Sequence, residues 1–247
     1  MKIGVFDSGI GGLTVVKSLL EHQLFEEIIY FGDTARVPYG SKDKNTIIRY
    51  AIEAVEFFKN FELEMIIVAC NTVSAYALDE MRESSNCPVI GVVEAGILAT
   101  SNAVENKDDN ILIIGTNATI ESKAYEDGLK NLNFSKLQTK ATSLFVPLVE
   151  EEIFDGEIVD ATLKHYFSDL THPQALILGC THFPLLSDTL QKYFGTQTLL
   201  IHSGDAIVEY LEGKFDFTHK YKKPVLKFFA SENPEALRTI AARWLDV

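Results

Sequence analysis

The chain has 247 residues, 47% hydrophobic and 23% charged, which is the composition of an ordinary folded protein with a large buried core. Its formal net charge of −13 argues against an electrostatic grip on nucleic acid or on an anionic membrane surface. No apolar run approaches the ~20 residues of a membrane span, and the strand expected directly after Met1 leaves no room for a signal peptide.

Apolar runs with the character of strands alternate with helical stretches almost throughout the chain. The expected strands cover residues 2–6, 27–31, 65–70, 89–93, 110–115, 136–139, 175–180, 198–201 and 225–229. The expected helices cover residues 12–22, 42–60, 73–83, 97–106, 121–132, 158–170, 185–194, 205–212 and 234–245. This alternation is typical of an α/β fold with parallel sheets covered by helices on both faces.

Two pairs of strand ends recur at nearly the same interval. Ser8 and Thr116 are separated by about 110 residues, and so are Cys70 and Cys180. We therefore expect two similar α/β domains that face each other across a cleft. The first would comprise residues 1–93 plus 205–247, and the second would comprise residues 94–204.

Ligands of open parallel sheets bind beyond the carboxyl ends of the strands. Residues with suitable chemistry occupy several of these ends: Asp7, Ser8, Asp33, Cys70, Thr116 and Cys180. The turn from Asp7 to Gly12 is rich in glycine and favours an anion. It is not a dinucleotide fingerprint, because Thr14 occupies the position of the third glycine, and no Walker lysine follows it.

The two cysteines at strand ends carry the main functional hypothesis. Each follows an apolar run and leads into a helical stretch, in Ala69-Cys70-Asn71-Thr72 and in Gly179-Cys180-Thr181-His182. Two thiols that face one substrate from opposite sides could invert a carbon centre by proton transfer. A helix N-terminus lowers the pKa of a thiol, so we expect both thiols to be substantially ionised general bases. Cys87 lies outside both patterns, and we expect it to be a packing residue.

The polar residues around the cysteines allow more than one interpretation. Asn71, Thr72, Thr181 and His182 could cap helices or donate hydrogen bonds to a carboxylate. His182 and Asp7 could protonate or orient Cys180 and Cys70, respectively. Glu150 could approach the site, but the pattern does not distinguish it from Glu151 and Glu152.

No residue pattern indicates a metal, a flavin, a nucleotide or pyridoxal phosphate. The chain has no C-x-x-C motif, its six histidines lack zinc-type spacing, and no strand-end loop supplies a lysine for a Schiff base. Three scattered cysteines are also too few for a disulfide framework. We expect a cofactor-independent protein in a reducing cytoplasm.

Four segments together resemble the glutamate racemase family. They are Phe6-Asp7-Ser8-Gly9-Ile10-Gly11-Gly12-Leu13-Thr14-Val15, Phe31-Gly32-Asp33-Thr34-Ala35-Arg36-Val37-Pro38-Tyr39-Gly40, Ala69-Cys70-Asn71-Thr72 and Leu178-Gly179-Cys180-Thr181-His182-Phe183-Pro184-Leu185-Leu186. The resemblance implies two pseudo-symmetric α/β domains, usually assembled as a homodimer. It implies an enzyme that interconverts L- and D-glutamate without a cofactor and supplies D-glutamate for peptidoglycan.

The resemblance also implies roles for individual residues. Cys70 would take the α-proton from D-glutamate with the help of Asp7, and Cys180 would take it from L-glutamate with the help of His182. The residues at substrate-binding positions of the family are Asp7, Ser8, Tyr39, Gly40, Asn71, Thr72, Thr116, Thr119, Glu150, Thr181 and His182. The departures are small: Val73 stands for a commoner Ala, Phe183 for Tyr and His202 for Asp.

Three other functions remain open from the sequence. The enzyme could racemise aspartate, since related two-cysteine racemases share the layout. The chain could instead bind an acidic amino acid without catalysis, with both cysteines serving as packing residues. A dithiol redox protein would form a disulfide between Cys70 and Cys180, which requires Cα atoms within about 7 Å.

Overall fold

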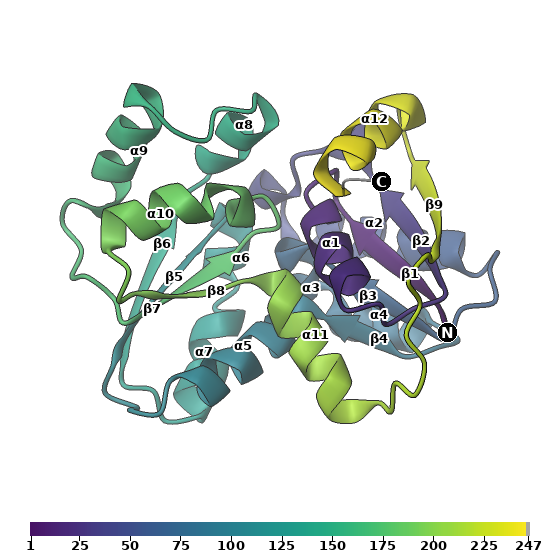
Figure 1. Cartoon of the computed structure of the whole chain (residues 1–247), viewed down its shortest axis with the longest axis horizontal. Helices are drawn as coiled ribbons and strands as arrows, with labels where there is room; N and C mark the ends of the chain where they lie inside the picture. Colours follow the sequence, from purple (N-terminus) through teal and green to yellow (C-terminus); the bar gives the residue numbers. More distant parts are fainter. Residues whose placement is uncertain (246–247) are drawn as a thin grey trace.

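The computed structural model describes residues 1–245 as two parallel β-sheets surrounded by helices (Figure 1). The first sheet has the strand order β4-β3-β1-β2-β9 and the second has the order β6-β5-β7-β8. The strands are β1 (Lys2–Asp7), β2 (Glu27–Gly32), β3 (Met65–Val68), β4 (Val89–Gly91), β5 (Asn110–Gly115), β6 (Lys136–Ala141), β7 (Ala175–Gly179), β8 (Leu199–Ile201) and β9 (Val225–Ala230). The predicted α/β class with parallel sheets is confirmed.

The two sheets repeat the same topology. In the first sheet β1 lies between β2 and β3, with β4 outside β3; in the second, β5 lies between β6 and β7, with β8 outside β7. All pairings are parallel. The equivalent strands β3 and β7 are therefore the ones that deliver Cys70 and Cys180. The late strand β9 pairs with β2 and returns the end of the chain to the first sheet.

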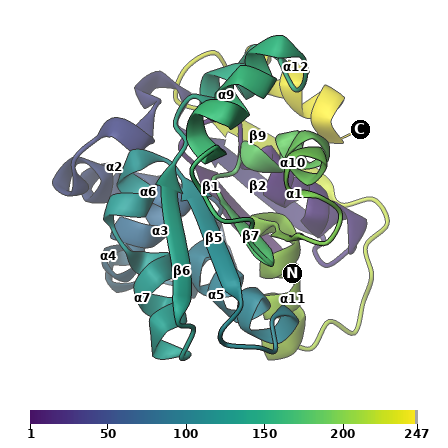
Figure 2. The same ribbon diagram turned by 90° about the vertical axis from the view of Figure 1, so that its left-hand side faces the viewer.

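The helices connect successive strands and cover both sheets (Figure 2). They are α1 (Leu13–Glu21), α2 (Lys44–Phe58), α3 (Asn71–Tyr76), α4 (Leu78–Ser84), α5 (Val92–Ala103), α6 (Asn117–Glu121), α7 (Ala124–Asn131), α8 (Phe145–Glu150), α9 (Glu157–Phe167), α10 (Ser187–Phe194), α11 (Ser203–Lys214) and α12 (Pro234–Leu245). Three short 3₁₀ helices, η1 (Thr34–Arg36), η2 (Tyr39–Ser41) and η3 (Phe183–Leu186), follow strand ends.

Two expected helices differ from those in the structure. The expected helix 73–83 is divided into α3 and α4 at Ala77, whose φ of −130° departs from helical geometry. The expected helix 121–132 corresponds to α7, which begins only after Lys123, a residue in a left-handed conformation with φ of 59°. The separate short helix α6 before Lys123 was not expected. The helical spacing alone could not reveal either difference.

Two further differences concern short elements. The helix α8 was not expected, because it is only 6 residues long and contains Pro147, which is tolerated there because it lies in the first turn. The strand expected over 89–93 ends at Gly91, and Val92 and Val93 form the start of α5. Both differences alter connections rather than the sheet topology.

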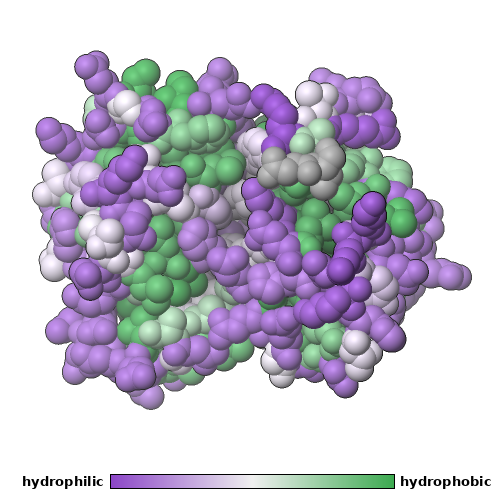
Figure 3. Space-filling model, viewed as in Figure 1, coloured by the Kyte–Doolittle hydropathy of each residue, from purple (hydrophilic) through white to green (hydrophobic). Residues whose placement is uncertain are grey.

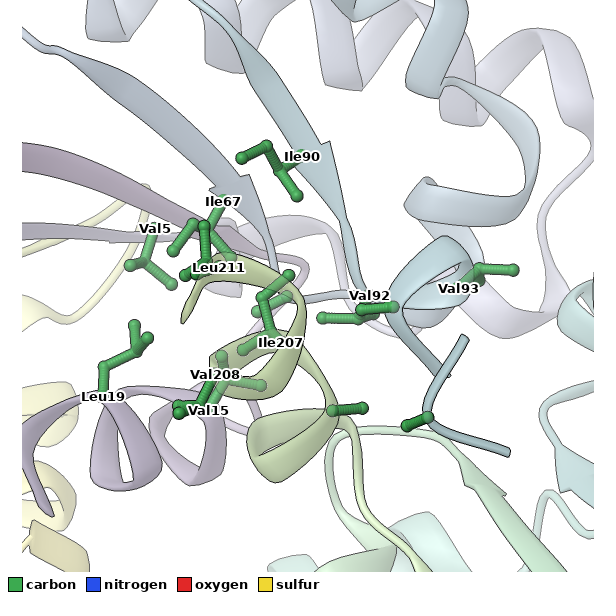
Figure 4. Packing of buried hydrophobic residues seen from close by; sticks show 14 of the residues in the cluster. Val5, Val15, Leu19, Ile67, Ile90, Val92, Val93, Ile207, Val208 and Leu211 are labelled. Carbon is green, nitrogen blue, oxygen red and sulfur yellow. The ribbon is translucent and has the colours of Figure 1, made fainter. Parts of the chain in front are cut away.

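The helix α11 ties the end of the second sheet to the first (Figure 4). It follows β8, and its residues Ile207, Val208 and Leu211 pack between the sheet residue Val5 and the α1 residue Val15 in one buried cluster. Burial of this apolar surface stabilises the return of the chain to the first sheet. The domain boundaries at 93/94 and 204/205 stay a proposal.

Figure 3 shows one face of the molecule, where hydrophilic residues alternate with several hydrophobic areas. Among residues 1–245, no helix combines the length and the apolar character required to cross a membrane.

Candidate active site

A cavity of about 340 Å³ lies beyond the carboxyl ends of strands from both sheets. The residues that line it are Ser8, Val37, Pro38, Tyr39, Gly40, Ser41, Cys70, Asn71, Thr72, Thr116, Asn117, Ser143, Val146, Pro147, Glu150, Gly179, Cys180, Thr181 and His182. Two residues expected at the site, Asp7 and Thr119, are buried directly behind this lining. The candidates from both halves of the chain therefore converge on one place.

The two thiols enter the cavity from equivalent positions. Cys70 follows β3 and Cys180 follows β7, and the two residues are 5% and 6% exposed, respectively. Cys70 Sγ lies 3.4 Å from Ser8 Oγ, and Cys180 Sγ lies 3.8 Å from His182 Nδ1. All three cysteines are free, and Cys87 lies outside the cavity lining.

The pKa of Cys70 differs from the expectation. Burial raises the pKa of this thiol to about 12, and the negative charge of Asp7 acts in the same direction. The contacts with Ser8 and with the N–H of Val73 oppose this effect only in part. The pKa of Cys70 is therefore shifted upward, opposite to the expected direction, because removal from water outweighs the position at a helix start.

His182 is held between a sulfur and a carboxylate. Its Nδ1 faces Cys180, while its Nε2 lies 3.3 Å from Glu150 Oε1, at an angle outside hydrogen-bond geometry. Burial lowers the pKa of His182, but the contacts with Cys180 and Glu150 outweigh it, so the pKa rises to about 10. His182 is thus an imidazolium at neutral pH.

Glu150 is the member of its acidic triplet that reaches the cavity. It ends α8 and contacts His182, whereas Glu152 forms an ion pair with Arg243 and Glu151 is exposed. The sequence could not separate these three residues, because the helix that orients them was not predicted.

Asp7 connects the turn after β1 to the turn after β7. Its Oδ2 accepts a hydrogen bond from Gly9 N at 2.9 Å, and its Oδ1 accepts one from the Thr181 hydroxyl at 3.4 Å. Complete burial raises the pKa of Asp7, although the charge of His182 and nearby backbone N–H groups oppose this. Asp7 is therefore coupled electrostatically to both thiol-bearing turns.

Three threonine hydroxyls form a closed triangle between the halves of the site. Thr72 Oγ1 lies 2.9 Å from Thr116 Oγ1 and 3.1 Å from Thr119 Oγ1, and the last two are 3.1 Å apart. Thr116 also caps α6, since its hydroxyl accepts from Thr119 N. Asn71 and Thr72, by contrast, do not cap α3, whose N-cap residue is Cys70.

Tyr39 is held by a residue that does not line the cavity. Asp33, at the end of β2, accepts hydrogen bonds from the Tyr39 hydroxyl and from Arg36 Nε. Burial and the bond to Asp33 raise the pKa of Tyr39 well above its ordinary range, so the phenol stays neutral. Of the strand-end candidates, Asp33 therefore acts behind the cavity wall.

Glycines allow the two halves of the site to approach closely. A methyl group on Gly11 would lie 2.4 Å from Thr181 Oγ1, and one on Gly40 would lie 2.5 Å from Thr116 Cβ. Both distances are shorter than real side chains tolerate, so these positions require glycine.

Eight lining residues were not named as site residues from the sequence: Val37, Pro38, Ser41, Asn117, Ser143, Val146, Pro147 and Gly179. Most of them adjoin residues that were named; Asn117, for example, directly follows Thr116, so its position in a strand-end turn was an available signal. Ser143, Val146 and Pro147 lie at or before α8, which the sequence did not reveal. No group of three or more His, Cys, Asp or Glu side chains in residues 1–245 is arranged to hold a metal ion.

The chain is similar to known proteins over its full length. The Asp/Glu/Hydantoin racemase family matches residues 12–211. A glutamate racemase of Nitratiruptor sp. is 60% identical over 245 residues, which are 99% of this chain and 96% of that protein. The crystal structure of glutamate racemase from Campylobacter jejuni has a TM-score of 0.97 at 53% identity and covers 100% of this chain and 99% of its own. Glutamate racemase from Francisella tularensis, solved in complex with D-glutamate, has a TM-score of 0.85 at 38% identity, with coverage of 100% and 94%.

Proposed function

Because the chain belongs to the Asp/Glu/Hydantoin racemase family, with glutamate racemases among its relatives, we propose that it interconverts L- and D-glutamate. The reaction is a two-base proton transfer at Cα that needs no cofactor. The observation that supports it best is the pair of free thiols, Cys70 and Cys180, which line one cavity from equivalent strand ends of two sheets.

Cys180 acts as the base on one face of the substrate. The imidazolium of His182 lies 3.8 Å from Cys180 Sγ, and its positive charge can stabilise an anionic sulfur. This thiolate takes the α-proton from L-glutamate and becomes a thiol, while the electrons of the C–H bond stay on Cα. Glu150 holds the imidazolium in place.

Cys70 acts as the acid on the opposite face of the substrate. With its pKa raised to about 12, this residue is a thiol before reaction and can donate its proton to Cα. That transfer produces D-glutamate and leaves Cys70 as a thiolate. The reverse reaction begins from this state, and the α-ammonium group of the substrate then offsets the burial of the charged sulfur.

The carbanion requires stabilisation, because the α-carbon is a weak acid. The backbone N–H groups of Asn71 and Thr72 at the start of α3, and of Thr181 and His182 before η3, lie ahead of the first bonds of these helices, Ser74 N to Cys70 O and Phe183 N to Cys180 O. They can donate to the substrate carboxylate. Near the two buried thiols, where little water is present, such fixed donors act more strongly than water would.

The test is to incubate the purified protein with L-glutamate in heavy water and follow both D-glutamate and deuterium at Cα. We expect Cys70→Ser and Cys180→Ser each to abolish nearly all racemisation, whereas the matched change Cys87→Ser leaves the rate unchanged. Full activity in either of the first two variants would refute the two-thiol reaction. Binding without deuterium incorporation would indicate a binding module, and faster turnover of aspartate would indicate a different substrate.

Two further parts of the proposal rest on similarity to glutamate racemases. The D-glutamate formed would supply peptidoglycan synthesis, and depletion of the protein should then be rescued by added D-glutamate. The chain would act as a homodimer in the cytoplasm, and light scattering of the purified protein measures the number of copies.

A further inference from the structure

A single buried side chain, Tyr125 on α7, contacts the neighbours of both thiols. Its hydroxyl donates a hydrogen bond to Asn71 Oδ1 at 2.7 Å, and Asn71 directly follows Cys70. Its ring also packs on Gly179, which directly precedes Cys180: a methyl group on Gly179 would lie 3.4 Å from Tyr125 Cε2. Tyr125 is 3% exposed and does not line the cavity.

The Tyr125 ring is fixed from two directions. On the edge opposite Gly179 it meets Gly96 of α5, where a methyl group would lie 3.0 Å from both Cε1 and the hydroxyl oxygen of Tyr125. The absence of side chains at Gly96 and Gly179 leaves a slot that the ring fills. A ring packed in this way cannot shift unless one of the backbones that form the slot moves.

The amide of Asn71 has a second tie to the strand that carries Cys180. Its Nδ2 donates to Ser203 Oγ at 3.1 Å, and the Ser203 hydroxyl donates to the carbonyl oxygen of Leu178 on β7 at 3.4 Å. Both polar atoms of this buried side chain are therefore engaged with other parts of the protein. Loss of one partner would leave an unsatisfied buried group and favour movement of the amide.

We propose that Tyr125 is a positioning residue that sets the separation of the two thiols by tying Asn71 to the Gly179 turn. The proposal rests on the two-thiol reaction proposed above. Tyr125 acts through Asn71 and Gly179 and does not touch the substrate. Ser203 reinforces this connection, because it bonds to the amide nitrogen of Asn71 and to the carbonyl oxygen of Leu178.

The separation of the thiols decides the fate of the carbanion. After the first sulfur has removed the α-hydrogen, the opposite thiol can protonate Cα with inversion, or the first thiol can return a proton with retention. A carbanion midway between fixed thiols favours inversion. If the opposite thiol lies farther away, a larger share of the carbanions is protonated again by the first thiol. The reason is that proton transfer depends steeply on a well-aligned donor.

The experiment compares the wild type with Tyr125→Phe, using D-glutamate deuterated at Cα in ordinary water. When the first sulfur exchanges its deuteron with water and returns a proton, unconverted D-glutamate loses its label. Chiral chromatography with mass spectrometry gives the ratio of unlabelled D-glutamate to L-glutamate formed at low conversion. We expect Tyr125→Phe to raise this ratio about three- to tenfold, which is the range that loss of one hydrogen bond supports.

The matched control is Tyr166→Phe. This residue is also buried, and its hydroxyl accepts a hydrogen bond from Leu144 N at 3.1 Å, away from Asn71. We expect this variant to keep the wild-type ratio, and Ser203→Ala to raise the ratio in the same direction as Tyr125→Phe. The ratio is measured only on active molecules, so a change in the folded fraction does not alter it.

Each outcome has one interpretation. An unchanged ratio in Tyr125→Phe, or an equal rise in Tyr166→Phe, would overturn the positioning role. If the wild type formed no L-glutamate, the proposed function itself would fail, and the two results are therefore distinguishable.

Discussion

The substitution Gly11→Ala should separate the two halves of the active site. Gly11 lies in the turn between β1 and α1, and an added methyl group would lie 2.4 Å from Thr181 Oγ1 and 2.6 Å from His182 Nδ1. Ordinary contact begins near 3.4 Å, so these atoms must withdraw by about 1 Å. They cannot withdraw freely, because the Thr14 hydroxyl holds the Thr181 carbonyl at 2.8 Å.

A shift of this size acts directly on the reacting groups, since His182 faces Cys180. A displacement of about 1 Å costs about 100-fold in rate where geometry controls the reaction, so we expect kcat/KM to fall by about that factor. Overpacking should also lower the free energy of unfolding by about 1–3 kcal/mol. Both are measurable, by racemisation followed with circular dichroism and by urea denaturation.

Gly213→Ala is the matched control for this change. No atom lies within 4 Å of a methyl group built at Gly213, and the position is within α11. We expect unchanged activity and a gain of about 0.5–1 kcal/mol in stability, because alanine favours a helix. Wild-type kcat/KM in Gly11→Ala would refute the close approach of the two turns.

Three further predictions concern titration and packing. Folding raises the pKa of His182 from about 6.5 to about 10, so the stability that its charged form contributes is fully present below pH 6.5 and is lost as the pH rises through 10. The difference in urea midpoint between the wild type and His182→Gln should therefore shrink as the pH rises from 6.5 to 10. A constant difference would contradict the raised pKa. Because burial raises its pKa to about 12, Cys70 should resist iodoacetamide at pH 8 and react faster only at higher pH, which peptide mass spectrometry can measure. Rapid labelling at pH 7 would be inconsistent with a buried thiol. Phe145→Ala should lower the free energy of unfolding by about 3–5 kcal/mol in urea titrations, since this ring is fully buried and packs edge-to-face with Phe183; a loss below 1 kcal/mol would show that the cluster is not closely packed.

The sequence reveals those parts of the fold that depend on local apolar patterns. Within residues 1–245 a strand is found at each of the nine predicted positions. The buried strands β3 and β7 follow continuous apolar runs, because strands covered on both faces require such runs. The break at Ala77 and the separate short helix α6 escape prediction, since helical spacing does not show where a helix is interrupted. The same limit hides α8, and with it the choice of Glu150.

The ionisation of Cys70 shows a limit of another kind. The residues that precede and follow it predict a helix start, which favours a thiolate. The depth of burial and the distance to Asp7 depend on the tertiary structure, and together they reverse the expected direction. The partners Tyr125 and Ser203 of Asn71 are likewise distant in the sequence and carry no motif of their own.

The triangle of Thr72, Thr116 and Thr119 contains three hydroxyl protons for three oxygen–oxygen contacts. In a cyclic arrangement each hydroxyl donates its proton to another hydroxyl of the triangle, so no proton remains to donate to a substrate oxygen. An anionic oxygen that enters must take over one of these protons and open the ring. Two of the three contacts join Thr72 of α3 to Thr119 of α6 or to its N-cap residue Thr116. A substrate oxygen that opens either contact replaces an internal hydrogen bond with one of its own and thereby connects the two halves of the site.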